Sequence, residues 1–148
     1  GADYCINVDQ QDMNKSLKEI WKDGADILVD TTGLASVIKE STQWLRTKSW
    51  EGEEDNNPKL LLLGSYTEEV CFDYFSFLFP KEPDIYTSRA CNPGDMKKAI
   101  QLLSSKQIKV RKLITEIFPY QKAELAYSEL DANPGQYMTF AFKWRDEA

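Results

Sequence analysis

Histidine is absent from all 148 residues of the chain, and this absence excludes several kinds of site. It removes the commonest general base, the Ser/His and Cys/His nucleophile pairs, and most zinc sites. No other arrangement of acids, bases and nucleophiles stands out along the sequence. We therefore predict no catalytic residue and no metal ligand in this chain, which disfavours a self-contained hydrolase or metalloenzyme.

Cysteine is scarce as well. Cys5, Cys71 and Cys91 are far apart, odd in number and form no CxxC pair. This pattern does not fit a disulfide scaffold, so it predicts reduced thiols in a cytoplasmic protein. Because no base stands nearby to activate a thiol, we expect these residues to be packed small side chains rather than nucleophiles.

Long apolar runs and an excess of basic charge are also missing. The longest apolar run is the four leucines from Leu60 to Leu63, whereas a membrane helix needs about 20 residues. The amino terminus shows no signal-peptide pattern. With 18 basic and 24 acidic residues, the net charge of -6 argues against a nucleic-acid partner. We expect no membrane span and a single domain with its own core.

The stretch Asp26–Gly33 is the centre of the sequence pattern. Its apolar residues Ile27-Leu28-Val29 run into the polar turn Thr31-Thr32-Gly33, and a helical pattern follows from Leu34. The arrangement recurs where Leu60–Leu63 runs into Gly64-Ser65-Tyr66. This pattern is typical of buried parallel strands that deliver their carboxyl ends to a ligand crevice.

Alternation of strand and helix patterns continues along most of the chain. We expect strands within residues 4–8, 26–30, 59–63, 83–88, 107–118 and 137–144. We expect helices within residues 12–22, 34–45, 93–103 and 119–130. This order predicts an α/β fold with a mostly parallel sheet and helices on both faces. The dense aromatic run from Phe72 to Phe79 is either core or an interface, and we predict that it is buried.

With these elements placed, the chain resembles the carboxyl-terminal part of the medium-chain dehydrogenase/reductase family, of the zinc alcohol and polyol dehydrogenase type. The resemblance lies in residues 1–7, 24–33, 60–64, 114–119, 123–130 and the closing strand. It covers nearly the whole chain but only the last portion of a typical member. It implies that residues 1–148 form one truncated, Rossmann-like dinucleotide-binding domain that lacks the first βαβ unit. The closing strand would return from the catalytic-domain side.

The resemblance also implies NAD or NADP as the coenzyme, bound across the carboxyl ends of the strands. The implied contacts are Thr31, Thr32, Gly33, Gly64, Ser65, Tyr66, Ser88 and Arg89. Glycine admits close backbone approach, and short hydroxyl side chains offer hydrogen bonds without bulk. The same residues also suit ordinary strand-to-helix turns, and Arg89 equally suits a surface pair with a nearby acid.

Asp26 and Asp30 lie four residues apart, on one face of the same strand. An acid/base pair is one interpretation of this spacing. Strand-end solvation or a helix cap is the simpler alternative, and we favour it.

Several parts of the family pattern are missing from this sequence. The phosphate-binding G-x-G-x-x-G turn has no match, and neither does the acidic residue that holds the adenosine ribose. The catalytic zinc ligands belong to a domain outside this chain. We therefore expect the chain alone to bind coenzyme weakly or not at all, and to be inactive.

Two functional interpretations follow from these residues. The first is part of an NAD(P)-dependent oxidoreductase that transfers hydride to or from an alcohol or polyol. The alternative is a small α/β assembly or protein-interaction domain that binds no coenzyme and uses the aromatic run as its contact surface.

The missing strands also raise two questions of assembly. In the family sheet they separate Tyr4–Val8 from Ile27–Asp30, so we hypothesise that Tyr4–Val8 moves beside Ile27–Asp30 through a right-handed crossover. The edge strand Ile85–Ser88 pairs across a two-fold axis in many dimers of the family. We therefore expect a homodimer through residues 85–88.

Overall fold

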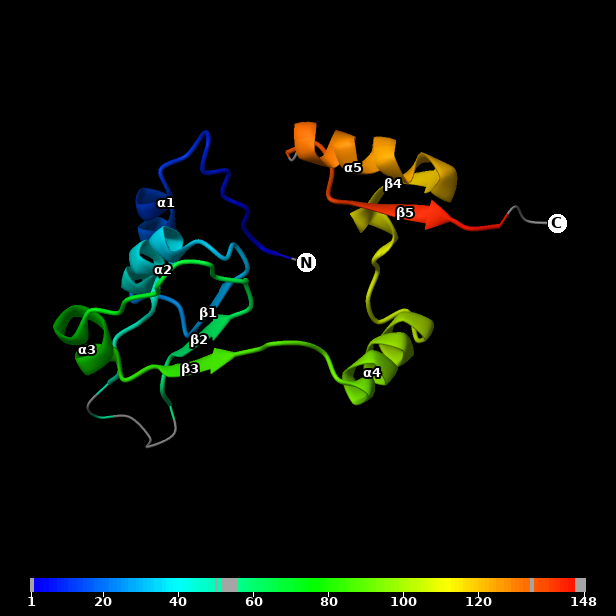
Figure 1. The fold of residues 1–148 in the computed structure, drawn as a ribbon. Helices are drawn as coiled ribbons and strands as arrows, with labels where there is room; N and C mark the ends of the chain where they lie inside the picture. Colours follow the sequence, from blue (N-terminus) through cyan, green and yellow to red (C-terminus); the bar gives the residue numbers. More distant parts are fainter. Residues whose placement is uncertain (1, 50, 52–55, 134, 146–148) are drawn as a thin grey trace. The chain divides into compact units, whose positions relative to one another are not determined.

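The computed structural model describes residues 2–49, 51, 56–133 and 135–145, which divide into two compact units (Figure 1). Unit 1 comprises residues 1–90 and unit 2 comprises residues 91–148. Gly1, the first residue of the resemblance, lies outside the described residues. Among the described residues, no helix combines the length and apolarity that crossing a bilayer requires.

Unit 1 is a small parallel sheet with helices packed on it. Its elements are α1 (Met13–Ile20), β1 (Ile27–Asp30), α2 (Ala35–Ser41), the 3-10 turn η1 (Thr42–Trp44), β2 (Lys59–Leu62), the π-helical segment η2 (Tyr74–Leu78), α3 (Phe79–Lys81) and β3 (Asp84–Thr87). The strand order is β1-β2-β3, and both pairings are parallel. The carboxyl ends of the three strands therefore lie at one edge of the sheet.

The core of unit 1 lies on one face of this sheet. Alternate residues of β2, Leu60 and Leu62, are buried there. They pack with Ile38 from α2, Leu45 after η1 and Phe77 from η2. The opposite face is more open, because the side chains of Val29 and Tyr86 are each 50% exposed.

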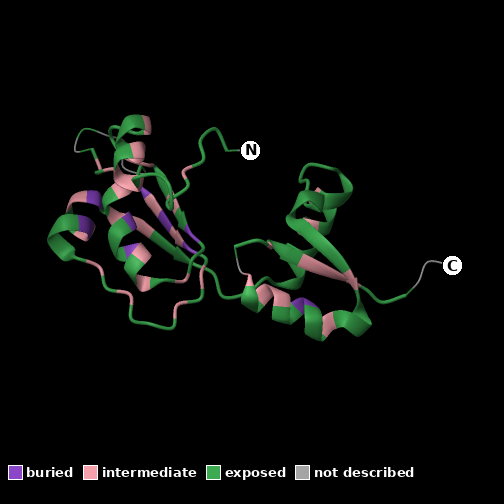
Figure 2. Cartoon of the chain, turned by 90° about the horizontal axis from the view of Figure 1, so that it is seen from above, coloured by how far each residue is buried: buried purple, intermediate pink, exposed green. Residues whose placement is uncertain are grey.

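Unit 2 contains a βαβ unit preceded by a helix. Its elements are α4 (Pro93–Ser104), the 3-10 turn η3 (Arg111–Leu113), β4 (Ile114–Pro119), the 3-10 turn η4 (Tyr120–Lys122), α5 (Ala123–Ala132) and β5 (Thr139–Lys143). Strands β4 and β5 are parallel, with Phe118 opposite Phe142. Ala126 is the only buried residue among those described in this unit (Figure 2).

These elements confirm the predicted α/β fold class with parallel strands. The predicted helix over residues 12–22 forms as α1, because the Asp12 side chain caps it by accepting from the Lys15 amide at 2.9 Å. The predicted strand over residues 107–118 is shorter than expected, since β4 begins only at Ile114. The extent of the single domain and the homodimer stay predictions, although β3 does lie at one edge of its sheet.

The expected placement of Tyr4–Val8 beside β1 is wrong, because these residues form no strand. Asn7 instead begins a turn, in which its carbonyl accepts from the amides of Gln10 and Gln11. The position beside the start of β1 is taken by the chain after η1. There, the Ala25 amide donates to the Trp44 carbonyl at 2.8 Å and the Arg46 amide donates to the Ala25 carbonyl at 3.0 Å.

Two predictions about burial are also wrong. Within the aromatic run only Phe77 is fully buried, whereas Tyr74, Phe75 and Phe79 are 58%, 81% and 54% exposed. The reason is the short helical segment formed by η2 and α3, which presents one side to the core and the other outward. All three cysteines are free thiols, as predicted, but they are exposed rather than packed.

Candidate functional site

The predicted binding residues lie in three turns at one edge of the sheet of unit 1. Residues 31–33 follow β1, residues 64–66 follow β2 and residues 88–89 follow β3. Because all three strands are parallel, these turns share the carboxyl edge. The sequence therefore correctly predicts that the eight residues lie along the same edge.

Asp30, the last residue of β1, ties the first two turns together. Its side chain is 5% exposed. One carboxylate oxygen accepts from the Thr32 hydroxyl at 2.8 Å, and the other accepts from the amides of Thr32 and Gly33 at 3.2 and 3.3 Å. The Tyr66 hydroxyl, from the turn after β2, donates to that second oxygen. One buried carboxylate thus accepts hydrogen bonds from both turns.

The two glycines permit the close contact between these turns. Gly33 has φ +72°, in the left-handed region that favours glycine. A Cβ atom on Gly33 would lie 2.5 Å from the Ser65 carbonyl oxygen, and one on Gly64 would lie 2.4 Å from the Gly33 nitrogen. Both contacts involve backbone atoms, so neither turn has room for a larger residue at these positions.

Electrostatics couple Asp30 and Tyr66. Burial raises the pKa of the Asp30 carboxyl, but hydrogen bonds from Tyr66, Thr32 and Gly33 outweigh it, and the net shift is downward. The pKa of Tyr66 is raised, first by burial and then by its hydrogen bond to Asp30 and the charge of that carboxylate. At neutral pH the pair is therefore a carboxylate that accepts from a neutral phenol.

The predicted contacts differ in how their polar groups are used. The hydroxyls of Thr32 and Tyr66 both point inward to Asp30, and Thr32 also accepts from the Leu34 amide at 3.2 Å. The remaining polar side chains are exposed at the edge: Thr31, Ser65, Ser88 and Arg89. These four exposed side chains are therefore available to a ligand, whereas the hydroxyls of Thr32 and Tyr66 hold the turns in shape.

Asp30 itself is the residue that the predicted binding set missed. The favoured interpretation of strand-end solvation or a helix cap fits the exposed Asp26 but is wrong for Asp30, which is 5% exposed and does not cap α2, whose N-cap is Leu34. Asp26 is exposed and forms an ion pair of 2.6 Å with Arg46, whereas Asp30 is enclosed by the turns. The signal in the sequence is an acidic residue at the last position of a buried apolar strand, followed by Thr-Thr-Gly.

The described residues do not fit the zinc that the family resemblance implies. They contain no group of three or more cysteine, aspartate and glutamate side chains placed to hold a metal ion. The chain has no histidine, and its three thiols are separate and exposed. No chemical step of this chain is therefore assigned to a metal.

Comparison with known proteins identifies dehydrogenases as relatives. No family model matches the chain. It is 24% identical over 111 residues to 2-dehydro-3-deoxy-L-galactonate 5-dehydrogenase of Pseudoalteromonas atlantica, a match that covers 75% of this chain and 30% of that protein. It is 27% identical over 112 residues to the Probable D-xylulose reductase A of Aspergillus terreus, which covers 76% of this chain and 29% of the relative.

Solved structures show the same fold at similar coverage. A short chain alcohol dehydrogenase from Escherichia coli, complexed with cofactor NADH, matches with a TM-score of 0.75 and 25% identity, over 93% of this chain and 37% of that one. An oxidoreductase/dehydrogenase of unknown specificity from Escherichia coli matches with a TM-score of 0.80 and 22% identity, over 99% of this chain and 39% of that one.

The chain thus spans between 29% and 39% of the length of these proteins. Its relatives by sequence are sugar dehydrogenases and reductases, and its fold is that of alcohol dehydrogenases. The chain is therefore similar to zinc-type alcohol and polyol dehydrogenases, and its partial coverage of them fits the carboxyl-terminal portion that the sequence resemblance implies.

Proposed function

We propose that this chain is part of an NAD(P)-dependent oxidoreductase of the alcohol or polyol dehydrogenase type, and that the carboxyl edge of unit 1 contributes to its coenzyme site. The substrate of the whole enzyme is an alcohol or polyol whose carbinol hydride passes to the nicotinamide. The zinc of the family belongs, in this proposal, to the remainder of the enzyme.

The observation that supports this proposal is the contact between the two glycine turns, which both donate hydrogen bonds to the Asp30 carboxylate. A coenzyme that lies across strand ends needs a preformed, close-packed backbone edge with few bulky side chains. Gly33 and Gly64 supply that edge, and the Asp30 carboxylate keeps both turns in place before any ligand arrives.

The exposed residues of the edge have complementary roles in this proposal. Thr31, Ser65 and Ser88 offer hydroxyls to the ribose or carboxamide of the coenzyme. Arg89 offers a guanidinium to its phosphates. The chain supplies no glycine-rich phosphate turn, so we expect an affinity in the millimolar range rather than the micromolar range.

The proposal is tested by titrating the chain with NADH and following its amide NMR signals. We expect saturable shifts confined to residues 31–33, 64–66 and 88–89. Arg89→Gln should weaken binding about threefold to tenfold, since one exposed phosphate contact is lost. Arg111→Gln, at an exposed arginine in unit 2, is the matched control and should leave the affinity unchanged. Shifts centred elsewhere, or the absence of shifts at millimolar NADH, would contradict the proposal.

A second candidate function is protein contact through the outer side of η2 and α3. Tyr74, Phe75 and Phe79 are mostly exposed yet contact one another, with ring centroids 5.2 to 6.5 Å apart. Clustered exposed aromatic rings are typical of interaction surfaces. Phe75→Ser should reduce self-association in sedimentation if this surface joins copies of the chain, and a monomer at all concentrations would remove that support.

A further inference from the structure

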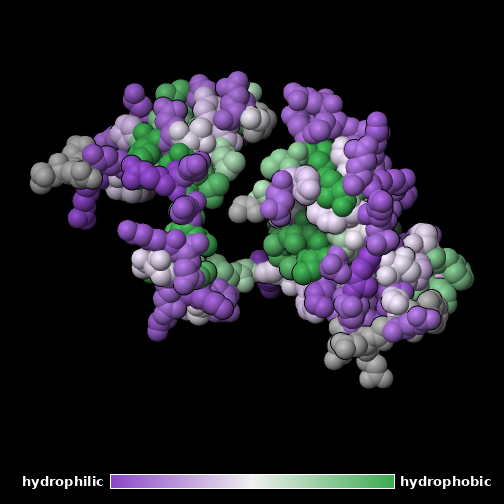
Figure 3. Space-filling view, turned by 180° about the vertical axis from the view of Figure 1, so that it is seen from behind, coloured by the Kyte–Doolittle hydropathy of each residue, from purple (hydrophilic) through white to green (hydrophobic). Residues whose placement is uncertain are grey.

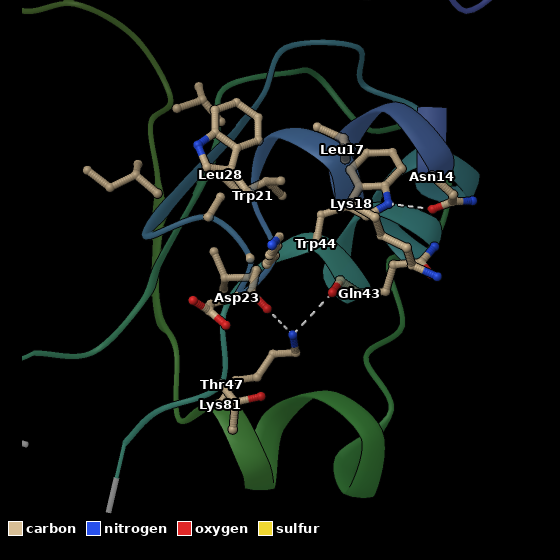
Figure 4. A pocket seen from close by; sticks show the side chains of 16 residues that line it. Asn14, Leu17, Lys18, Trp21, Asp23, Leu28, Gln43, Trp44, Thr47 and Lys81 are labelled. Carbon is tan, nitrogen blue, oxygen red and sulfur yellow. Dashed lines mark hydrogen bonds between the residues drawn. The ribbon is translucent and has the colours of Figure 1, made fainter. Parts of the chain in front are cut away.

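A cavity in unit 1 lies away from the carboxyl edge. Its volume is about 370 Å³, which falls in the size range of small-molecule sites. It is bounded by α1, the turn before β1, β1 itself, the segment around η1 and Lys81 of α3 (Figure 4). None of the eight predicted coenzyme contacts lines it, so it is separate from the site described above.

The walls of this cavity are largely apolar and aromatic. Leu17 of α1 and Trp21, the residue that follows the end of this helix, both line the cavity. Ile27 and Val29 of β1 also line the cavity and are 56% and 50% exposed. The space-filling view shows a concentration of hydrophobic residues on unit 1 (Figure 3).

The second tryptophan of the cavity is held in place. The Trp44 indole nitrogen donates to the Asn14 side-chain oxygen at 2.7 Å, and Asn14 also lines the cavity (Figure 4). A fixed indole offers a rigid apolar contact surface at little cost in side-chain entropy. The cavity therefore contains one preorganised aromatic wall before any ligand binds.

The ionic character of the cavity is positive, in contrast to the acidic chain around it. Lys18, Lys22 and Lys81 line it, against one acid, Asp23. The chain as a whole carries a net charge of -6. A local excess of cations in an acidic protein favours an anionic occupant.

Lys81 is the principal anchor for such an occupant. The residue is only 7% exposed. The ammonium donates to the carbonyls of Leu45 and Gln43, the latter at 3.4 Å. Among the described residues, no ion pair includes Lys81. Burial accordingly lowers the pKa of Lys81. An ammonium has three donors, so one remains for a ligand.

We propose that this cavity binds a small amphipathic anion, a carboxylate or sulfonate with an aromatic or branched apolar body. The apolar body lies between Trp21 and Trp44, and the anionic group accepts from Lys81. Such a ligand supplies the counter-charge that the buried ammonium lacks, and it covers the exposed side chains of β1.

The probe pair for this test is 8-anilinonaphthalene-1-sulfonate and its neutral counterpart N-phenyl-1-naphthylamine. Their ring systems are alike, and only the first carries an anion. We expect the sulfonate to bind with one-to-one stoichiometry, to receive energy from Trp21 and Trp44, and to bind at least about tenfold more tightly than the neutral probe, because hydrogen bonds to charged groups are strong.

Variants then locate the anion. Lys81→Met keeps the length of the side chain and removes the ammonium, so it should weaken sulfonate binding about tenfold and leave the neutral probe unchanged. Lys15→Met, on the same helix as Lys18 but outside the cavity, is the control and should alter neither probe. The double variant Lys18→Gln/Lys22→Gln lies at exposed positions, so it reports on the charge even if Lys81→Met unfolds.

Equal binding of the two probes would overturn the proposal, as would sulfonate binding that persists in both lysine variants. Several bound probes per chain would likewise overturn it, since they would indicate general binding to exposed apolar surface. Failure of NADH binding leaves this result unaffected, because the two sites share no residue.

Discussion

The two units contain the same kinds of element but differ in what those elements bury. Unit 1 joins α2, η2 and β2 around five buried side chains: Ile38, Leu45, Leu60, Leu62 and Phe77. Unit 2 buries only Ala126 among its described residues (Figure 2). Regular secondary structure is therefore present in both units, whereas a core is present in one. Burial rather than helix or strand content decides which unit resists unfolding.

Helix α4 illustrates the difference within a single element. Its amino terminus has a complete capping box, in which Asn92 accepts from the amides of Gly94 and Asp95, and Asp95 accepts from the Asn92 amide. Yet the stripe formed by Met96, Ile100 and Leu103 is 53%, 56% and 41% exposed. Local signals form this helix, and no described contact buries its apolar side.

The βαβ part of unit 2 depends on aromatic contacts instead of a closed core. Phe118 of β4 and Phe140 of β5 lie 4.9 Å apart, and Tyr120 stacks on Trp144 at 5.1 Å. Such pairs contribute about 0.5–1.5 kcal/mol each beyond area burial. We therefore expect amide protons of unit 1 to exchange more slowly than those of unit 2.

The largest expected effect comes from truncating the core of unit 1. Leu60 is fully buried, so Leu60→Ala should lower the free energy of unfolding by about 3 kcal/mol, through lost burial and the cavity left behind. Leu125→Ala is the matched change in unit 2, where the side chain is 49% exposed, and should cost under about 1 kcal/mol. Urea titrations followed by tryptophan fluorescence measure both. Equal losses would show that the units share one core.

Glycine substitutions give the next effect. Gly64→Ala places a methyl group 2.4 Å from the Gly33 nitrogen and 2.6 Å from its α carbon, so the turns must separate. We expect a loss of about 2–3 kcal/mol in urea titrations, as is typical of overpacking against backbone. Gly135→Ala in unit 2 meets nothing within 4 Å and should change stability by less than about 0.5 kcal/mol. An unchanged free energy of unfolding in Gly64→Ala would contradict the close packing of the two turns.

Removing the charge of Asp30 comes third. In Asp30→Asn the side-chain NH2 group is a donor and cannot accept from the donors that now face the carboxylate. We therefore expect the free energy of unfolding to fall by about 2 kcal/mol at pH 7. The folded pKa of Asp30 lies below its unfolded value, so this contribution is present above about pH 4 and disappears as the pH falls through the folded pKa. The stabilities of the two proteins should therefore converge in acid. A constant difference down to pH 2 would contradict the assignment.

Tyr66→Phe tests the other end of the same hydrogen bond. The folded pKa of Tyr66 is raised, so its stabilising contribution is complete below the unfolded value of about 10 and is lost as the pH rises above it. We expect the free energy of unfolding of the variant to be about 1 kcal/mol lower at pH 7 and to decline less steeply as the pH rises above about 10. Tyr127→Phe, at a tyrosine of unit 2 that is 62% exposed, should change neither quantity. Thermal unfolding at pH 7 and pH 10.5 measures both.

The sequence alone predicted the strands of unit 1 and the edge they share. The reason is that Ile27–Val29 and Leu60–Leu63 are continuous apolar runs that end in glycine turns, a signal that depends only on nearby residues. Asp12 at the start of α1 and Pro93 at the first turn of α4 are local signals of the same kind. Features that depend on a few consecutive residues can therefore be predicted from the sequence alone.

Features that depend on residues far apart in the chain could not be predicted from the sequence. The displacement of Tyr4–Val8 by the Trp44–Arg46 segment involves a pairing 20 residues away along the chain from Ala25. The role of Asp30 depends on Tyr66, 36 residues further on. Which aromatic side chains of the run are buried depends on which side of the η2–α3 segment packs against Ile38 and Leu60. Each of these outcomes is set by tertiary contacts that hydrophobic pattern does not encode.

The smallest expected effect concerns the cap of α4, and it tests whether the units unfold independently. Asn92→Ala removes the oxygen that accepts from Gly94 at 2.7 Å and Asp95 at 3.1 Å. The loss should be about 1 kcal/mol and confined to α4, because its apolar stripe gives the helix no second anchor. Hydrogen exchange should quicken in residues 94–104 and stay unchanged in β1 and β2. Asn92→Ser retains a capping oxygen and should restore most of the protection. Faster exchange in β2 of the alanine variant would instead show that the core of unit 1 depends on this helix.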